Sequence, residues 1–253
     1  MISFTNLYTF SLLATAVLGD TTSTTSKRGA AYNDAVSVTK ITGGGNTGVE
    51  YVPMLWGKGS EDFTTGIKNL LTARGDDKTT KILGFNEPDI KGQSYLSVAD
   101  AVTEWQTYMT QFAKNATLIS PAPTSSENAD QGLNWLKSFM TECKNCNISG
   151  LAFHWYGTSA DQFKTHVQEA IDIANLHNID NVWCTEFGLN DDMNTTIGVR
   201  HSENTVAFLD EVLPWLDDQP NITHYSWFMS ANKFTYFSNN NTMTDAGTQY
   251  IAN

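Results

Sequence analysis

The sequence has few cysteines, few prolines and few basic residues. Only 3 Cys and 6 Pro occur among 253 residues, which excludes a disulfide-rich scaffold and a proline-rich disordered chain. Lys and Arg number 15 against 27 Asp and Glu, so the formal net charge is −12 at pH 7. This shortage of cations argues against nucleic-acid binding, because Lys and Arg neutralise the phosphates there. The 40% of apolar residues is enough for the core of an ordinary globular protein.

Long apolar runs are also missing. The run at 7–18 is too short to span a membrane and is typical of a signal-peptide core, with a buried first helix as the alternative. We therefore predict a signal peptide at 1–19, a propeptide or linker at 20–28 that ends in the basic pair Lys27–Arg28, and one folded domain at 29–253. The protein is expected to be secreted to the extracellular side, with the cell wall as a candidate location.

The glycosylation signals and the cysteines agree with export. Cys143 and Cys146 lie in a polar loop and are expected to form a local disulfide, because zinc would need two more ligands and a redox motif a different context. Cys184 lies in an apolar run and is expected to be a buried free thiol. The N-x-[ST] glycosylation signals stand at Asn115, Asn147, Asn194, Asn221 and Asn240.

Short apolar runs alternate with amphipathic stretches along most of the chain. The apolar runs read as buried strands, and the amphipathic stretches have helical spacing. This alternation predicts a parallel sheet in an α/β fold. A closed TIM-type barrel is favoured over an open doubly wound sheet, which would want a Gly-rich phosphate turn after its first strand. The apolar runs lie at 29–33, 49–56, 81–88, 117–123, 151–157, 182–188 and 224–229.

Two glutamates stand at predicted strand ends. Glu87 lies in Gly-Phe-Asn-Glu-Pro-Asp, and Glu186 lies in Thr-Glu-Phe-Gly. Because the carboxyl ends of barrel strands meet at one face, both side chains are expected near one cavity. Two such carboxyls provide an acid and a nucleophile for cleaving glycosidic bonds. For either glutamate alone, a salt bridge within a barrel layer is the simpler explanation.

Six motifs in order carry a resemblance to a known family. VPMLWG, ILGFNEPD, SPAP, HWYG, TEFG and WFM resemble the fungal glycoside hydrolase family 128, the secreted endo-β-1,3-glucanases. The resemblance implies a retaining mechanism with Glu87 as general acid and base and Glu186 as nucleophile. It also implies that Asn86 hydrogen-bonds the 2-hydroxyl of the sugar. The expected ligand is β-glucan, bound by a monomer without a cofactor.

Further side chains near strand ends are candidates for binding the sugar. His154 and Tyr156 share strand parity, so both can face the cavity. Trp227 is the preferred floor under the reacting sugar, with Trp56 and Tyr32 as further candidates and core packing as the alternative. The five histidines are scattered without metal-ligand spacing, so no metal site is expected.

One stretch departs from the family. Its members carry an aromatic-rich second strand, but only fifteen residues, 34–48, separate the first two apolar runs here. Because a parallel neighbour needs a crossover of a dozen residues or more, we predict seven regular parallel strands, with the first two adjacent or separated by a gap. We also expect weak or absent activity despite Glu87 and Glu186, together with poor stability. The alternatives are a non-catalytic glucan-binding or cell-wall protein, and a hydrolase of β-1,4-glucan or mannan.

Overall fold

The strands and helices are described from a computed structural model of the chain. It describes residues 12–15, 27–32, 50–74, 80–190, 203–228 and 243–251. The strands are β1 (Leu12–Thr15), β2 (Arg28–Tyr32), β3 (Glu50–Val52), β4 (Lys81–Leu83), β5 (Thr117–Ile119), β6 (Leu151–Gly157), β7 (Val182–Leu189) and β8 (Ile222–Trp227). The helices are α2 (Glu61–Arg74), α3 (Val98–Tyr108), the 3-10 turn η1 (Thr110–Phe112), α4 (Gly132–Glu142), α5 (Ala160–Leu176), α7 (Glu203–Asp218) and α8 (Asp245–Ile251).

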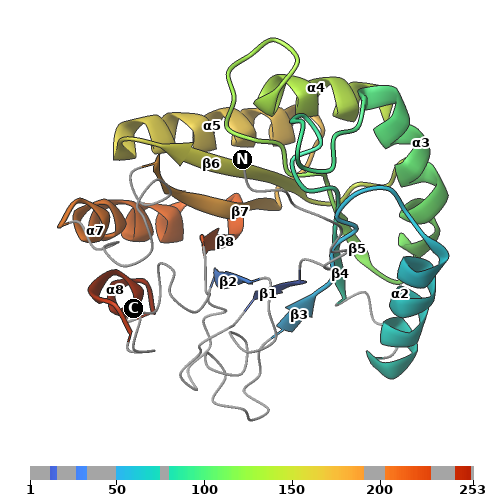
Figure 1. Cartoon of the computed structure of the whole chain (residues 1–253), viewed down its shortest axis with the longest axis horizontal. Coiled ribbons are helices and arrows are strands. Elements are labelled where there is room, and N and C mark those ends of the chain that lie inside the picture. The colour runs from blue at the N-terminus through green and yellow to red at the C-terminus, as the bar shows by residue number, and fades with distance from the viewer. Residues whose placement is uncertain are drawn as a thin grey trace.

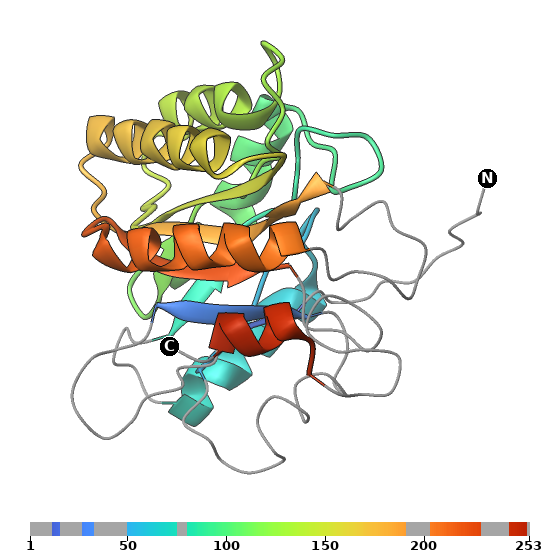
Figure 2. The ribbon, with the colours of Figure 1, turned by 90° about the vertical axis from the view of Figure 1, so that its left-hand side faces the viewer.

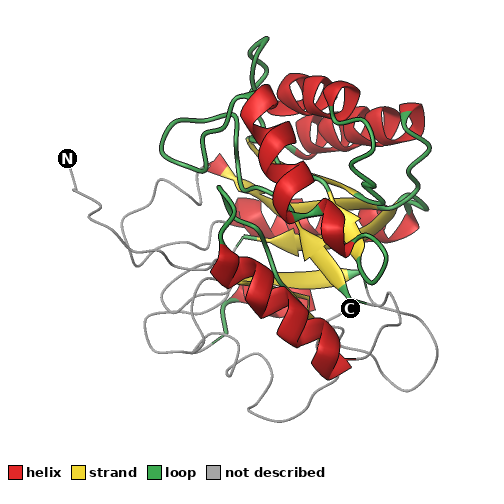
Figure 3. Cartoon of the chain, turned by 90° about the vertical axis from the view of Figure 1, so that its right-hand side faces the viewer, coloured by secondary structure: helices red, strands yellow, loops and turns green. Residues whose placement is uncertain are grey.

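The strands form a ring with the helices outside it (Figures 1 and 3). Strands β2, β8, β7 and β6 pair in parallel, as do β4 and β5. Single parallel bridges, Met54 to Leu83 and Ile119 to Gly150, continue the ring from β3 to β4 and from β5 to β6. This arrangement confirms the predicted α/β barrel.

The predicted arrangement of the first two parallel strands is wrong. Within the described residues seven strands run in parallel, but β2 and β3 are neither adjacent nor separated by an empty gap. Strand β1 lies between them and pairs antiparallel with both, with Leu13 opposite Ala31 and Val52. Without β1, the facing edges of β2 and β3 would carry unpaired N–H and C=O groups, and the four residues of β1 satisfy them. The interval 34–48 lies outside the described residues.

Apolar side chains form two layers, as a barrel requires. The inner layer comes from the strands and their ends alone and includes Val52, Leu83, Ile119 and Trp183. The outer layer joins alternate strand residues to the helices and is much larger. Both layers follow from the alternation of side chains along each strand. No described helix is long and apolar enough to cross a membrane.

Helix α3 shows how local sequence signals position this outer layer. The side chain of Ser97 accepts a hydrogen bond from the backbone N–H of Asp100, which caps the helix as its sequence predicts. Ala101 and Trp105 are spaced four residues apart and are both fully buried. The indole N–H of Trp105 donates to the backbone carbonyl of Cys146 at 2.9 Å, which ties α3 to the loop after α4.

The cysteines lie where the sequence suggests. Cys143 and Cys146 form a disulfide at the end of α4, with Cα atoms 5.5 Å apart, and Cys184 is a buried free thiol. Of the glycosylation signals, Asn147 is exposed and Asn115 and Asn221 are half-buried. Asn194 and Asn240 lie outside the described residues.

The folded part of the chain begins before the predicted boundary at Gly29. Arg28 is the first residue of β2, pairs with Tyr225 of β8 and is only 8% exposed. Residues 27 and 28 therefore contact the barrel and are not a detached linker.

Candidate active site

The two glutamates identified from the sequence lie together at the carboxyl ends of the strands. Glu87 follows β4, and Glu186 is in the second half of β7. One carboxylate oxygen of each lies within 4.8 Å of the other. Their side chains are 13% and 14% exposed, so both retain access to solvent. This spacing is close to the ~5–5.5 Å of retaining glycosidases and well below the ~6.5–9.5 Å of inverting ones.

Strand β6 supplies two polar side chains that contact these carboxylates. His154 Nδ1 lies 3.1 Å from Glu87 Oε1 and 3.5 Å from Glu186 Oε2. The Tyr156 hydroxyl donates to Glu186 Oε2 at 2.6 Å. Because ionised carboxylates only accept, the proton of the His154 ring belongs on Nδ1. Alternation along β6 therefore brings His154 and Tyr156 to the two glutamates, as their spacing in the sequence predicts.

A bulge in β7 turns Glu186 toward the site. Phe153 pairs with Cys184, but the next residue, His154, pairs with Glu186, so Thr185 is an extra residue on β7. Trp183 belongs to the inner layer, and regular alternation would send Glu186 outward. The extra residue reverses the alternation, as bulges beside active sites often do.

Glu87 is held in an uncommon backbone conformation. Its φ is +42°, in the left-handed region that costs a non-glycine residue roughly 1 kcal/mol or more. Its backbone N–H donates to the carbonyl of Ala122 at 2.8 Å, which fixes the turn against the neighbouring strand end. Asp89, two residues on, is buried and accepts hydrogen bonds from Thr124 N and Gly132 N at 3.0 and 2.8 Å. These bonds join the Glu87 loop to the start of α4.

The environment shifts the proton affinities of three site residues. Burial, reinforced by the charge of Glu87, raises the pKa of Glu186, although His154 and Tyr156 act in the opposite direction. Burial lowers the pKa of His154, but the nearby carboxylates, Glu186 foremost, outweigh it and the net direction is upward. Burial and the charge of Glu186 raise the pKa of Tyr156 well above its usual value, so its hydroxyl stays a donor.

The same cluster is the group among the described residues that could share a cation. Glu87, His154 and Glu186 offer three ligand-type atoms within 4.8 Å of one another, although the spacing of histidines in the sequence suggested no metal set. The hydrogen bonds already described account for this proximity.

The other predicted sugar-binding residues separate into two groups. Asn86 is buried beside Glu87, and its side-chain N–H donates to Gln93 at 3.2 Å. Trp56 is half-buried and packs on the inner layer near the site. The side chain of Tyr32 lies outside what the structure describes, although its backbone ends β2.

Trp227 does not lie where the sequence analysis expected it. It is fully buried in the outer layer, and its ring lies 5.8 Å from that of Tyr250 in α8. The next residue, Phe228, packs on the inner layer and lies edge-on to Tyr156 at 5.9 Å. Phe228 is not among the residues predicted from the sequence, although alternation lets only one of two adjacent residues face inward. Phe228 is therefore the better candidate for contacting a sugar.

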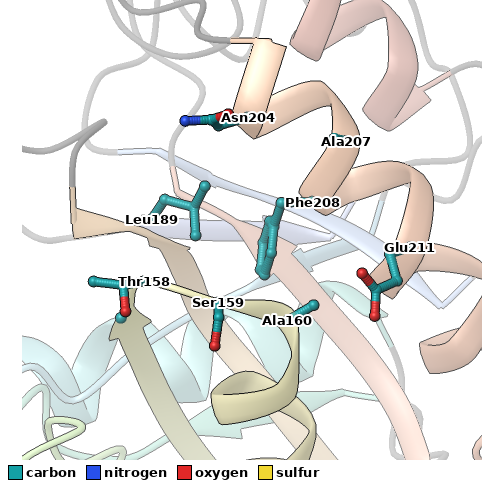
Figure 4. A pocket seen from close by; sticks show the side chains of 9 residues that line it. Thr158, Ser159, Ala160, Leu189, Asn204, Ala207, Phe208 and Glu211 are labelled. Atoms are coloured by element: carbon teal, nitrogen blue, oxygen red, sulfur yellow. The ribbon is translucent and has the colours of Figure 1, made fainter.

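A separate cavity of about 270 Å³ lies beside the barrel mouth, between the starts of α5 and α7 (Figure 4). Its lining includes Thr158, Leu189, Asn204 and Phe208. It does not include the two glutamates, His154 or Tyr156. It therefore lies outside the carboxylate cluster.

Known proteins with a similar sequence or structure agree with this fold. The sequence profile of the family described as "Glycosyl hydrolase catalytic core" matches residues 22–250. A solved relative is a curdlan-specific exo-β-1,3-glucanase of glycoside hydrolase family 128, subgroup III, from Blastomyces gilchristii, in complex with glucose. It is 36% identical, with a TM-score of 0.70, and the match covers 88% of this chain and 97% of that one.

Two further matches are more distant. An oligosaccharide-binding protein of family 128, subgroup VII, from Cryptococcus neoformans is 24% identical with a TM-score of 0.58 over 80% of this chain and 78% of that one, which shows the fold alone. Alkali-sensitive linkage protein 1 of Schizosaccharomyces pombe (strain 972 / ATCC 24843) is 25% identical over 182 residues, 68% of this chain. The match spans 32% of the length of that curated relative.

Proposed function

The chain belongs to the glycosyl hydrolase catalytic core family, within glycoside hydrolase family 128, and from this premise we propose that it is a retaining endo-β-1,3-glucanase. The observation that carries the proposal is the pair of partly exposed carboxylates, Glu87 and Glu186, with oxygens within 4.8 Å of each other. The name of the 36% identical Blastomyces relative, a β-1,3-glucanase, supports the substrate class.

The proposed reaction has two steps. Glu186 attacks the anomeric carbon while Glu87 gives its proton to the departing glycosidic oxygen, which leaves a covalent glycosyl-enzyme. Glu87, now ionised, then takes a proton from water, which attacks the same carbon and releases Glu186. Tyr156 donates to the Glu186 oxygen at 2.6 Å, and His154 Nδ1 lies within 3.5 Å of both carboxyl groups, so these two side chains orient the glutamates.

Product analysis on laminarin tests this proposal. We expect the wild type to release oligosaccharides whose anomeric configuration is retained in the first minutes by NMR. The Glu186→Ala variant should release none, while the matched Glu169→Ala variant on α5, which removes an exposed glutamate, should match the wild type. An inverted product would contradict the retaining mechanism.

Cleavage position and linkage need separate arms of the same experiment. A ladder of oligosaccharides supports internal cleavage, whereas glucose alone from the start indicates the exo action named for the Blastomyces relative. Release of sugar from β-1,4-glucan or mannan, but not from laminarin, would overturn the assigned linkage.

A second candidate function is binding without turnover. The Cryptococcus neoformans protein, described as oligosaccharide-binding, has the same fold. This chain has both glutamates, with His154 in contact with Glu87 and Tyr156 hydrogen-bonded to Glu186, which disfavours binding without turnover. A pull-down on insoluble β-1,3-glucan beside the laminarin assay separates the two, since retention on glucan without any product supports binding alone.

Location and assembly form part of the proposal. The apolar run at 7–18 and the glycosylation signals support a monomeric protein secreted to the extracellular side, where a β-glucan wall would meet it. Mass measurement of protein recovered from the culture medium, before and after enzymatic deglycosylation, tests export and glycan attachment together.

A further inference from the structure

Lys27, which directly precedes β2, caps the carboxyl end of helix α7. Its Nζ donates to the backbone carbonyls of Leu216, Asp217 and Gln219 at 3.3, 2.7 and 2.7 Å. These carbonyls lie at the carboxyl end of α7, where helical carbonyls lack intrahelical partners and favour a cation. The last turn of α7 has no basic residue of its own. Lys27 therefore supplies the positive charge that this helix end lacks.

Arg28 makes a second, buried set of contacts with the same region. Its Nε donates to the Tyr225 hydroxyl at 2.8 Å, and its two terminal nitrogens donate to the Tyr250 carbonyl at 2.9 Å and to Asp217 Oδ2 at 3.1 Å. The Tyr225 hydroxyl donates in turn to Asp217 Oδ1 at 2.6 Å. Arg28 thus links β2 to β8, α7 and α8, which lie side by side in Figure 2.

Cleavage after Arg28 would break all of these contacts. Endoproteases that process precursors cut after a basic pair, and they need that pair in an extended, accessible segment. Here the segment is already paired in the sheet, because Tyr225 N–H donates to the Lys27 carbonyl at 2.9 Å. Loss of residues 27 and 28 would leave the exposed Asp217 carboxylate and the α7 carbonyls without their cations. It would also take the donors of Arg28 from the buried Tyr225 hydroxyl and Tyr250 carbonyl, where an unmade hydrogen bond is costly.

We propose that Lys27 and Arg28 form a permanent clamp between the first and last parallel strands of the barrel, and that the mature protein keeps both. Its N-terminus then lies upstream of Lys27, and the basic pair is not a processing site. This replaces the propeptide boundary that the sequence alone predicts, and it does not depend on catalytic activity.

The N-terminus of the secreted protein tests the proposal directly. The full chain is expressed in a fungal host that has a dibasic-specific endoprotease, and the secreted product is analysed by intact mass and N-terminal sequencing. We expect a first residue before Lys27. A folded, secreted product that begins at Gly29 would overturn the proposal.

Protease treatment provides a second arm. Lys27–Arg28 is the one adjacent basic pair in the sequence, so a purified dibasic-specific endoprotease has a single site. We expect the folded protein to resist cleavage, and the same protein in urea to be cut once, after Arg28. Equal cleavage rates with and without urea would contradict the clamp.

Point variants of the full chain measure the contacts themselves. Arg28→Met should lower Tm by roughly 5–10 °C, because it removes a buried, hydrogen-bonded charge. Lys27→Met should lower Tm by a few degrees, which keeps the test open if the Arg28 variant fails to fold. Lys137→Met, the control, removes the same charge from an exposed site on α4 and should stay within about 1–2 °C of the wild type. A Tm for Lys27→Met equal to that of the control would overturn the proposal.

Discussion

Tyr156 holds Glu186 with a single short hydrogen bond, and its removal should change the pH dependence of the reaction. The hydroxyl stabilises the ionised carboxylate, so it offsets part of the upward shift that burial gives the pKa of Glu186. In Tyr156→Phe that pKa should rise further. Because the nucleophile must be ionised, the acid limb of the kcat/KM profile on laminarin should move to higher pH. An unchanged limb, with Tyr108→Phe as control, would argue against this contact.

The two glutamates should respond differently to the leaving group. Glu186→Gln should remove nearly all turnover on every substrate, because no covalent intermediate can form. Glu87→Gln should lose much less on aryl glycosides with activated leaving groups, which need little protonation. Initial rates on laminarin and on such a glycoside measure both effects. Equal losses in the two variants on both substrates would contradict the assigned roles.

Asp89 acts on the site through the backbone that carries Glu87. Its carboxylate accepts from Thr124 and Gly132, and Gly132 has a φ of +55° where an added Cβ would collide with the Ser126 carbonyl. Asp89→Asn replaces one accepting oxygen with a donor, so we expect a loss of about 1–3 kcal/mol in unfolding free energy.

The kinetic signature of Asp89→Asn distinguishes a positioning role from general destabilisation. In assays well below Tm, kcat should fall more than KM changes, because Glu87 loses its alignment. Asp130→Asn removes the same charge from an exposed position of the next loop and should leave kcat unaltered. A fall in Tm alone would assign Asp89 to the fold and not to the reaction.

At the scale of elements, two irregularities of the sheet lie beside the carboxylates, although another shift, at Val182 and Trp183, lies at the start of β7. Thr185 is the extra residue of β7, and a further shift in the pairing of β7 with β8 lies between Cys184 and Phe187. The strained turn of Glu87 stands at the end of β4, across the ring. With regular alternation Glu186 would point into the outer layer. The extra residue of β7 and the left-handed turn at Glu87 bring both carboxylates to the inside of the barrel.

The loop after α4 offers a test by thiol titration. With Cys143 and Cys146 joined, the denatured protein without reductant should show one titratable thiol, that of Cys184. The native protein should show none, because burial raises the pKa of Cys184 well above its usual value and keeps reagents out. Three thiols after denaturation would exclude the disulfide. Its removal should cost only about 2 kcal/mol, since the closed loop is short.

At the scale of the whole molecule, strand β1 closes the barrel in the full chain, and signal-peptide cleavage after residue 19 would remove it. It supplies the backbone partners of β2 and β3 from within the predicted signal peptide. A chain that begins at residue 20 should therefore expose two sheet edges, with a lower Tm and more aggregation than the full chain. Thermal unfolding and light scattering of the two chains measure this. Identical behaviour would show that β1 contributes nothing to closure.

The sequence by itself determined the features that depend on short-range pattern. Alternating strand and helix segments predicted the barrel, and the positions of Glu87 and Glu186 at strand ends predicted that they meet. The spacing of His154 and Tyr156 predicted a shared face. These inferences held because the period of side chains along a strand is local, and because parallel strand ends gather at one face.

Tertiary structure alone decided the features that depend on pairing between distant segments. Alternation shows that Trp227 and Phe228 face opposite layers, but it does not say which of them faces inward. A bulge such as the one at Thr185 is recognised only from the register with its partner strand. Lys27 and Arg28 resemble a processing site in sequence, yet their partners lie almost 200 residues away. Local pattern carries no information on such contacts, because the free energy that selects them arises only when both segments meet.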